Sequence, residues 1–300
     1  MAFKSSTLSG ITIDRLQTLC SVVESGTIVV AAGPDPNRQS LFSRQLKDLE
    51  KALGTTLFDR AGKTLKLNEN GRRVVLAAHT FFGSLDDVIN AAVAASETVV
   101  LGASEAILRW LILPNLGELM AGDPPLRFEV RSMPSEGALK EIQIGHIDLA
   151  IIRTEVMSED LESEIIVPIQ HVFAVPRTLL RTKEGAEVFE GRPIPFAELG
   201  GDPFFAKTAR ATAKALGLNL LPIIQVESFS LLMSAVESGN AAAFIPTIAA
   251  RSLPEQRFAQ VSAEPMKEMD RSLSLVWYGK SAESRPSIRR AITRLKRALA

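Results

Sequence analysis

The side chains best suited to chemistry lie on one face of a helix predicted over residues 37–54. Apolar residues at steps of four, three and four predict a buried face, and they are Phe42, Leu46, Leu49 and Leu53. The opposite face carries hydroxyl and basic groups, on Ser40, Ser43, Arg44, Lys47 and Lys51. Such groups contact the phosphates and base edges of DNA. Taken alone, the pattern also fits an ordinary amphipathic surface helix.

The segment before this helix is a tight turn, Gly33-Pro34-Asp35-Pro36-Asn37. Asp35 can cap the helix and Pro36 suits its first position, while Gly54 lies where a helix should stop. A short helix over 28–32, with Thr27 as its cap, precedes the turn. This order of elements is a helix, a tight turn and a second helix with a basic outer face. It is the arrangement with which a helix-turn-helix protein binds the major groove of DNA.

Further elements complete a small N-terminal domain over residues 1–67. Apolar spacing predicts a first helix from Ile13 to about Ser25. Residues 57–67 alternate weakly and turn at Ala61-Gly62, which predicts a two-stranded hairpin. Three helices and a hairpin form a winged helix-turn-helix.

A long helix is predicted over residues 68–96, with Asn68 as its cap. Its apolar residues repeat every three or four positions at Val74, Ala78, Phe81, Leu85, Val88, Ala92 and Ala95, and Phe82 and Ile89 widen this seam. A heptad seam buries against a partner helix, which can belong to another copy of the chain or to the next domain. The three histidines, at positions 79, 146 and 171, have no metal-ligand spacing, so we expect no metal site.

Residues 97–300 alternate between strands and helices, as in a parallel-type α/β layer. The pattern restarts near Ile165, which predicts two lobes: residues 97–155 with 268–300, and residues 156–267. Predicted strands include 99–101, 126–131, 149–152, 165–167, 172–175, 204–205, 223–226, 242–245 and 272–277. Predicted helices include 138–144, 209–216, 229–238 and 287–299. The overall expectation is an α+β multidomain chain whose two-lobed part binds a small molecule in the cleft between the lobes.

Composition indicates a globular chain of about two domains, since 46% of its 300 residues are hydrophobic and 23% are charged. Residues 1–73 carry a net charge of +4 and the remainder −4, which fits a head that binds a polyanion. Cys20 is the single cysteine, and there is neither a signal pattern nor an apolar run of eighteen residues. We therefore expect a cytoplasmic protein. No phosphate loop or catalytic set is recognisable, so we expect neither an enzyme nor a cofactor.

Motifs along nearly the whole chain resemble the LysR-type transcriptional regulators. In the head these are Ser25-Gly26-Thr27, Ala31-Ala32, residues 38–46, Leu49-Glu50, Leu53-Gly54, Leu57-Phe58-Asp59-Arg60 and residues 70–73. In the body they are Leu113-Pro114, residues 145–151, residues 236–239 and Phe244-Ile245-Pro246. The resemblance implies a DNA-binding dimer or tetramer, joined through the linker helix, with a periplasmic-binding-protein-like domain that senses a small-molecule effector. The chain departs from the family at residues 33–37, at Arg38 and Ser40, and at Ile28 to Val30, where that helix is usually more polar.

Roles on promoter DNA follow from position. We expect Arg38 and Gln39, at the start of the helix, to contact base edges, although Arg38 could equally neutralise a phosphate. Phosphate or base contacts are expected from the outer face at Ser40, Ser43, Arg44 and Lys47. Thr27 would offer its hydroxyl and the nearby N–H groups to a phosphate. Arg60, Lys63 and Lys66 would support the wing near the minor groove or the backbone.

Candidate effector-binding groups follow strand ends and helix starts. They are Ser104, Glu105, Ser135, Arg153, Thr154, Phe205, Lys207, Thr208, Ser228, Phe229, Pro246 and Thr247. Ser104 and Ser228 could merely cap helices. Helix N-termini with Arg153 or Lys207 favour an anionic effector, whereas Glu105 favours a cationic or polyol one.

Two other classes of function remain open on the sequence. The chain could be a cytoplasmic small-molecule-binding protein or enzyme with a non-functional head, or the head could make only protein contacts. The basic head and the heptad seam favour the regulator. A steep salt dependence of DNA binding would separate these classes.

Overall fold

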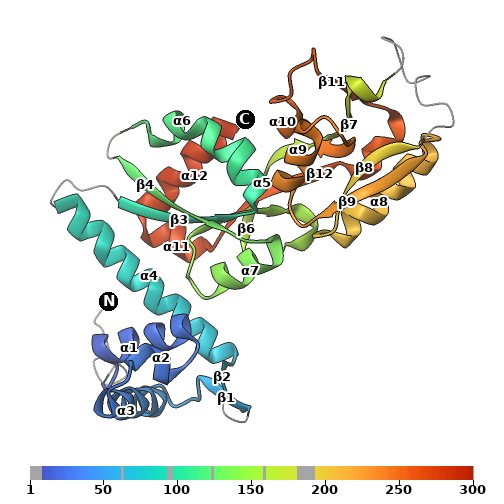
Figure 1. Cartoon of the computed structure of the whole chain (residues 1–300). Coiled ribbons are helices and arrows are strands. Elements are labelled where there is room, and N and C mark those ends of the chain that lie inside the picture. Colours follow the sequence, from blue (N-terminus) through green and yellow to red (C-terminus); the bar gives the residue numbers. More distant parts are fainter. Residues whose placement is uncertain are drawn as a thin grey trace.

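Figure 1 shows the computed structural model, which describes residues 9–61, 64–92, 97–122, 125–157, 160–180 and 193–299. A helical head is joined by one long helix to a larger part that has two lobes. Among the described residues, no helix is long and apolar enough to cross a bilayer.

The head is the winged helix-turn-helix that the sequence predicts. Its elements are α1 (Ile13–Ser25), α2 (Ile28–Ala32), α3 (Pro36–Leu53), β1 (Phe58–Ala61) and β2 (Thr64–Leu67). β1 and β2 pair antiparallel, and the expected turn residue Gly62 lies outside the described residues. Leu19, Leu49 and Leu57 are fully buried in the core of the head.

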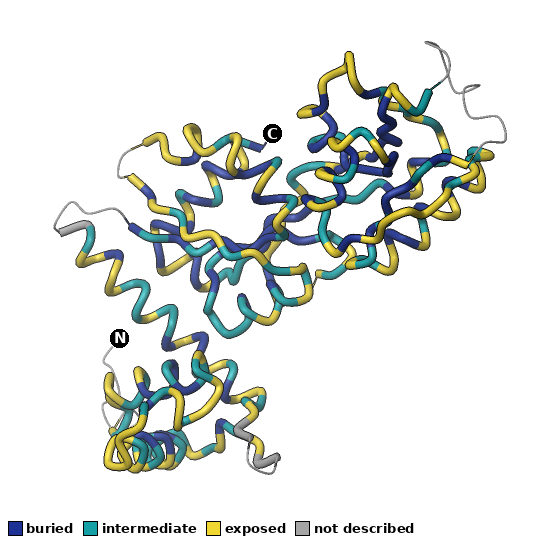
Figure 2. Tube along the Cα trace, viewed as in Figure 1, coloured by how far each residue is buried: buried dark blue, intermediate teal, exposed yellow. Residues whose placement is uncertain are grey.

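The linker helix α4 (Glu69–Ala92) begins where the sequence places it, since the Asn68 side chain accepts a hydrogen bond from the Gly71 N–H at 2.9 Å. Val74 of the seam packs on the head core and Ala78 is buried, whereas four later seam residues are exposed. Phe81 and Leu85 are about two-fifths exposed, and Val88 and Ile89 are 67% and 59% exposed. Figure 2 shows this helix running between the head and the first lobe. Ala95 and the side chain of Ala92 lie outside the described part.

The first lobe contains a five-stranded sheet in the order β4-β3-β5-β12-β6. Its strands are β3 (Glu97–Ala103), β4 (Leu126–Ser132), β5 (Leu149–Arg153), β6 (Glu162–Ile169) and β12 (Arg271–Trp277). β3 runs parallel to β4 and β5, whereas β12 runs antiparallel to β5 and β6, so the layer is not purely parallel. The first-lobe helices are α5 (Glu105–Ile107), α6 (Leu116–Met120), α7 (Ser135–Gln143), α11 (Gly279–Ser284) and α12 (Pro286–Leu299), with a π-helical turn at Leu108–Ile112.

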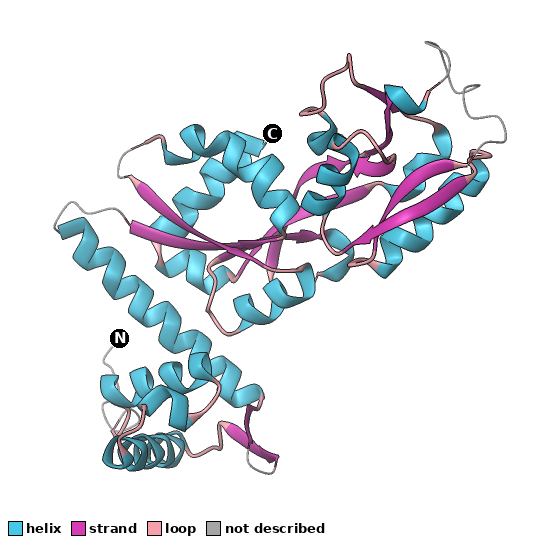
Figure 3. Ribbon diagram, viewed as in Figure 1, coloured by secondary structure: helices cyan, strands magenta, loops and turns pink. Residues whose placement is uncertain are grey.

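Both faces of this sheet are covered, as is usual where strands are parallel. Leu149 and Ile151 of β5 pack in a cluster that contains Leu295 of α12. Ala150 and Ile152, which alternate with them, pack in a second cluster that contains Ile142 of α7. This two-sided burial explains why β5 is a continuous apolar run in the sequence. Figure 3 shows the helices that lie on the two sides of the sheet.

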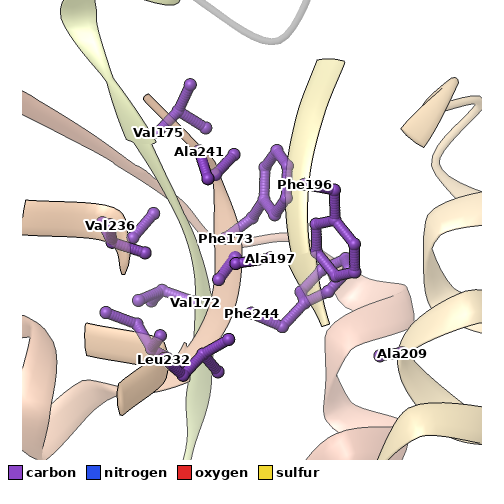
Figure 4. Close-up of a cluster of buried hydrophobic side chains, with 14 of the residues drawn as sticks. Val172, Phe173, Val175, Phe196, Ala197, Ala209, Leu232, Val236, Ala241 and Phe244 are labelled. Carbon is purple, nitrogen blue, oxygen red and sulfur yellow. The ribbon is translucent and has the colours of Figure 1, made fainter. Parts of the chain in front are cut away.

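The second lobe contains the antiparallel sheet β10-β7-β11 and the parallel pair β8-β9. Its elements are β7 (His171–Pro176), β8 (Ile194–Leu199), α8 (Pro203–Ala215), β9 (Leu220–Val226), α9 (Phe229–Glu237), β10 (Ala243–Pro246), α10 (Thr247–Ala250) and β11 (Phe258–Val261). Phe173 and Phe244 form the centre of its core, with ring centroids 4.8 Å apart, and Phe196 packs against Phe244 (Figure 4).

The structure corrects three expectations. Phe204 and Phe205 form no strand but lie in the first turn of α8, because Asp202 caps that helix and Pro203 starts it. Strands β8 and β11 were not predicted. The chain enters the second lobe after Ile169 rather than near residue 156, because β6 pairs with β12 in the first-lobe sheet.

Candidate functional site

The turn between α2 and α3 is held by its own side chains. The Asp35 carboxylate accepts from the Asn37 N–H at 2.9 Å, and Pro36 occupies the first helical position. The Gln39 amide nitrogen donates to the Gly33 carbonyl at 2.7 Å. Gln39 is half-buried near the start of α3, and its side-chain amide stabilises the turn through this hydrogen bond.

The outer face of α3 is exposed because the opposite face is fixed in the head core. Phe42, Leu46 and Leu49 are buried as predicted. The predicted DNA-binding residues of this face are exposed at Arg38, Ser40, Arg44 and Lys47 and half-buried at Ser43. The Arg38 guanidinium lies over the Phe42 ring, 5.3 Å from its centroid, which keeps that side chain at the start of the helix.

Two polar contacts hold α1 against α3. Arg15 pairs with Asp48 at 2.8 Å, and the Thr18 hydroxyl donates to the Gln45 amide oxygen at 2.7 Å. α3 therefore presents its outer face on a rigid support, as direct base readout requires.

Thr27 caps α2 as predicted, since its hydroxyl accepts from the Val30 N–H at 3.1 Å. Beside it, Val29 and Val30 are 60% and 66% exposed, and the sequence reasoning did not place them in the site. Three consecutive β-branched residues in a five-residue helix were the available signal, because a helix this short cannot bury all of them. Exposed apolar groups next to a base-reading helix can contact thymine methyl groups.

The predicted wing residues are placed only in part. Lys66 is exposed on β2 and lines a groove with Arg72, Arg73 and Lys140 of the first lobe. Lys63 and the side chain of Arg60 lie outside the described residues. Arg72 and Arg73 both pair with Glu69, which lowers the pKa of that carboxyl.

The two lobes meet where α5 packs against α9. Ser104 caps α5 and Ser228 caps α9, with hydroxyl oxygens 3.5 Å and 3.3 Å from the N–H groups they accept from. Glu105 is exposed and Phe229 half-buried at these two helix starts. The structure therefore brings these four predicted residues to the interlobe face, although both hydroxyls are used as caps.

Arg153 bridges the lobes rather than standing open. Its guanidinium pairs with Glu136 at 2.7 Å and with Asp202, the N-cap residue of α8 in the second lobe, at 3.2 Å. The Ser135 hydroxyl accepts from the Arg153 N–H at 3.2 Å. A ligand carboxylate can compete with Asp202 for Arg153, because both present the same acceptor atoms.

Other predicted cleft residues have structural contacts. Phe205 is buried, with its ring centroid 5.0 Å from that of Phe229 and 5.3 Å from that of His171. Burial lowers the pKa of His171 to about 4, with a further contribution from the Arg271 charge.

Three further predicted residues, Thr154, Thr208 and Pro246, do not offer free groups to the cleft. The Thr154 hydroxyl donates to the Ser272 carbonyl of β12 at 3.0 Å, and Pro246 is buried. The Thr208 hydroxyl donates to the Phe204 carbonyl at 3.0 Å. Thr247 is half-buried at the start of α10, where its backbone N–H donates to the Gln170 carbonyl at 2.9 Å. Lys207, by contrast, is exposed at the start of α8.

A buried polar network that the sequence did not reveal fixes α4 to the first lobe. Arg285 pairs with Asp148, and its second nitrogen lies 3.6 Å from Asp87 of α4. The Ser287 hydroxyl donates to Asp87 at 2.5 Å. Gly83 permits this approach, because a Cβ there would lie 2.7 Å from the Arg285 guanidinium carbon. α4 thus presents one face to its own lobe and the opposite, apolar face to solvent.

Comparison with protein families assigns both parts of the chain. Residues 13–72 match the bacterial regulatory helix-turn-helix proteins of the lysR family, and residues 94–300 match the LysR substrate binding domain. One relative, a probable RuBisCO transcriptional regulator from Synechocystis sp., is 23% identical over 283 residues, which cover 88% of this chain and 80% of that protein.

Solved structures share the fold over nearly the whole chain. ArgP from Mycobacterium tuberculosis matches with a TM-score of 0.69 at 17% identity, over 95% of this chain and 96% of that one. Full-length CbnR in complex with its target DNA matches with a TM-score of 0.56 at 18% identity, over 96% and 100%. The chain belongs to the LysR family of bacterial transcriptional regulators, with a DNA-binding helix-turn-helix head and an effector-binding domain.

Proposed function

We propose that this regulator inserts α3 into the major groove of its promoter and reads sequence with the start of that helix. The observation that carries the proposal is the exposed face of Arg38, Ser40, Arg44 and Lys47 on a helix whose other face is buried. Arg38 contacts a base edge, and Arg44 and Lys47 neutralise phosphates. Thr27 and Lys66 add contacts to the phosphate backbone of the DNA on either side of α3.

Dimerisation is proposed to occur through the exposed seam of α4. Phe81, Leu85, Val88 and Ile89 form an apolar strip opposite the face that Asp87 fixes to the first lobe. A second copy of α4 would bury this strip, and two heads would then contact two half-sites on DNA. A solved structure of similar fold is described as a complex with its target DNA, which supports the DNA contact in this proposal.

The effector is proposed to be a small anionic molecule that binds between the lobes. Arg153 is the central cation, and an effector carboxylate would replace Asp202 as its partner. Loss of the Arg153–Asp202 pair would change the angle between the lobes. The buried network at Arg285 would carry that change to α4 and so to the spacing of the heads, provided the effector binds the two states with different affinity.

Fluorescence anisotropy with DNA from upstream of its own gene, against scrambled DNA of equal length, tests the proposal. We expect tighter binding to the native fragment and a steep fall of affinity as salt rises. Metabolite carboxylates can then be screened in the same assay. Folded protein that binds neither DNA at low salt would contradict the proposal.

A further inference from the structure

Three residues with metal-binding side chains meet where the head, the linker helix and the first lobe come together. Glu24 lies near the end of α1, His79 lies on α4, and His146 follows α7. One ligand atom from each lies within 4.8 Å of the other two. These residues are far apart in the sequence, so their spacing does not reveal the cluster. It forms because the head packs against the first lobe.

Each of the two imidazoles has a ring nitrogen without a hydrogen-bond partner among the described residues. The Nε2 atoms of His79 and His146 are buried and have no hydrogen-bond partner among the described residues. The rings meet edge to face, with centroids 5.2 Å apart, and the His79 Nε2 lies 4.0 Å from a Glu24 carboxylate oxygen. Buried polar atoms in proteins are normally hydrogen-bonded, so two unsatisfied imidazole nitrogens in a cluster that also contains a carboxylate indicate a missing partner.

A second carboxylate orients one of the histidines as in metal sites. The Nδ1 of His146 lies 2.9 Å from Glu141 on α7. When Nδ1–H donates to Glu141, Nε2 carries the lone pair that a metal needs. This carboxylate–imidazole arrangement is the usual outer shell of a histidine ligand.

The backbone is shaped to bring the two histidines together. Gly145 has a φ of +76°, and a Cβ on it would lie 2.8 Å from the Cβ of His79. A larger residue would therefore push the end of α7 away from α4. The His146 N–H donates to the Glu141 carbonyl at 2.9 Å, which closes the end of α7 in this position.

The local charges also suit a cation. Glu24 and Glu141 supply two carboxylates, against the nearby guanidinium of Arg131, which pairs with Glu129 at 2.8 Å.

We propose that Glu24, His79 and His146 form a binding site for one borderline divalent transition-metal ion, with Zn²⁺ as the probe. Two imidazoles and one carboxylate are a donor set that binds zinc and leaves a fourth position for water. Ligand atoms in a tetrahedral zinc site lie about 3.3 Å apart, so Glu24, which is half exposed, must turn inward to close the set. Bound metal would tie α1 of the head directly to the first lobe.

Zinc binding to the full-length, untagged chain tests this directly. Competition with a chromophoric chelator should give one Zn²⁺ per chain. Glu24→Gln, His79→Gln and His146→Gln should each weaken binding by at least about tenfold, and Glu141→Gln by about 10–100-fold, as expected for an outer-shell partner. Co²⁺ bound in place of Zn²⁺ should show visible ligand-field absorption that these variants lose.

His171→Phe is the matched control, because His171 lies in the second lobe and should leave zinc binding unchanged. Glu24 is exposed, so Glu24→Gln keeps the test valid if a buried histidine variant fails to fold. Wild-type protein that binds Zn²⁺ no more tightly than Glu24→Gln or His79→Gln would overturn the site.

The consequence for regulation rests on the proposed DNA binding and has its own readout. Zn²⁺ should shift the DNA affinity of the wild type but not of Glu24→Gln. Unchanged DNA affinity in zinc-loaded wild type would overturn the coupling. Protein that binds zinc but no DNA at all would contradict the proposed function instead, and leave the metal site standing.

Discussion

Arg153 of the first lobe and Asp202 of the second form an ion pair of 3.2 Å across the interlobe boundary. Both side chains are about one-third exposed, so the pair is partly solvated and worth little to global stability. Arg153 also pairs with Glu136 of its own lobe, so its charge keeps a partner when the Asp202 contact breaks. The Arg153–Asp202 pair is therefore suited to switching between two arrangements of the lobes rather than to stabilising the fold.

Asp202→Asn tests this relationship without disturbing α8, because asparagine also caps helices well. We expect the free energy of unfolding to fall by less than about 1 kcal/mol. Amide hydrogen exchange should become faster at the end of β5 and the start of α8, since the lobes separate more often. A loss of several kcal/mol would show that the pair is structural.

For Arg285 we expect a large contribution to stability, because its guanidinium is buried between two carboxylates. Arg285→Met should lower the free energy of unfolding by about 3–5 kcal/mol, since it leaves buried charges without a partner. Arg289→Met, an exposed position on the neighbouring α12, should have little effect in the same urea titration. Equal effects of the two variants would contradict the role of the network.

The seam of α4 predicts a change in oligomeric state. Val88 is 67% exposed in the single chain, so Val88→Glu should leave the monomer folded but weaken dimerisation strongly. Asp86→Ala, about 100° around the helix from Leu85, is the matched control. Sedimentation velocity should show a lighter species only for Val88→Glu, and a dimer that survives the substitution would refute the seam as the interface.

His171 predicts how stability depends on pH. Its pKa is about 4 in the fold and near 6.5 when exposed, so the unfolded chain binds the extra proton between these values. The free energy of unfolding should therefore fall as pH is lowered from 6.5 to 4, by about 3 kcal/mol from this group. His171→Phe keeps a ring beside Phe205 and should reduce this slope, although His79, with its pKa also lowered to about 4, retains part of it. An unchanged slope in thermal unfolding across this range would exclude His171 as the cause.

Phosphate contacts by α3 predict a change in salt dependence. Lys47→Ala should reduce the slope of log affinity against log salt by about 1 per head and weaken native and scrambled DNA alike. Lys214→Ala, exposed on α8 in the second lobe, should leave the slope unchanged. The same slope for both variants would remove Lys47 from the interface.

Local signals made the head predictable from sequence. Thr27 and Asp35 cap the helices where their residue types predict, and Gly54 ends α3 in a left-handed conformation with a φ of +68°. These signals act within a few residues. For the same reason the Asp202-Pro203 cap decided the structure of Phe204 and Phe205, whose strand-like composition misled the prediction.

Contacts between distant residues could not be predicted. Nothing near Arg153 indicates Asp202, and nothing near Arg285 indicates Asp87. The same holds for Glu24, His79 and His146, whose positions gave no metal-ligand spacing although the fold brings them together. In a single sequence these residues are only isolated polar positions. Whether two of them come into contact depends on how whole domains pack.

Selection of binding sites from random double-stranded DNA is the measurement that tests the central claim most directly. Wild-type protein should enrich two half-sites, one for each head of a dimer, and Arg38→Ala should lose preference at one position of each half-site. That loss should correspond to about 1–3 kcal/mol of discrimination. Enrichment of no common sequence by folded wild-type protein would contradict the account of α3 as a reader of DNA sequence.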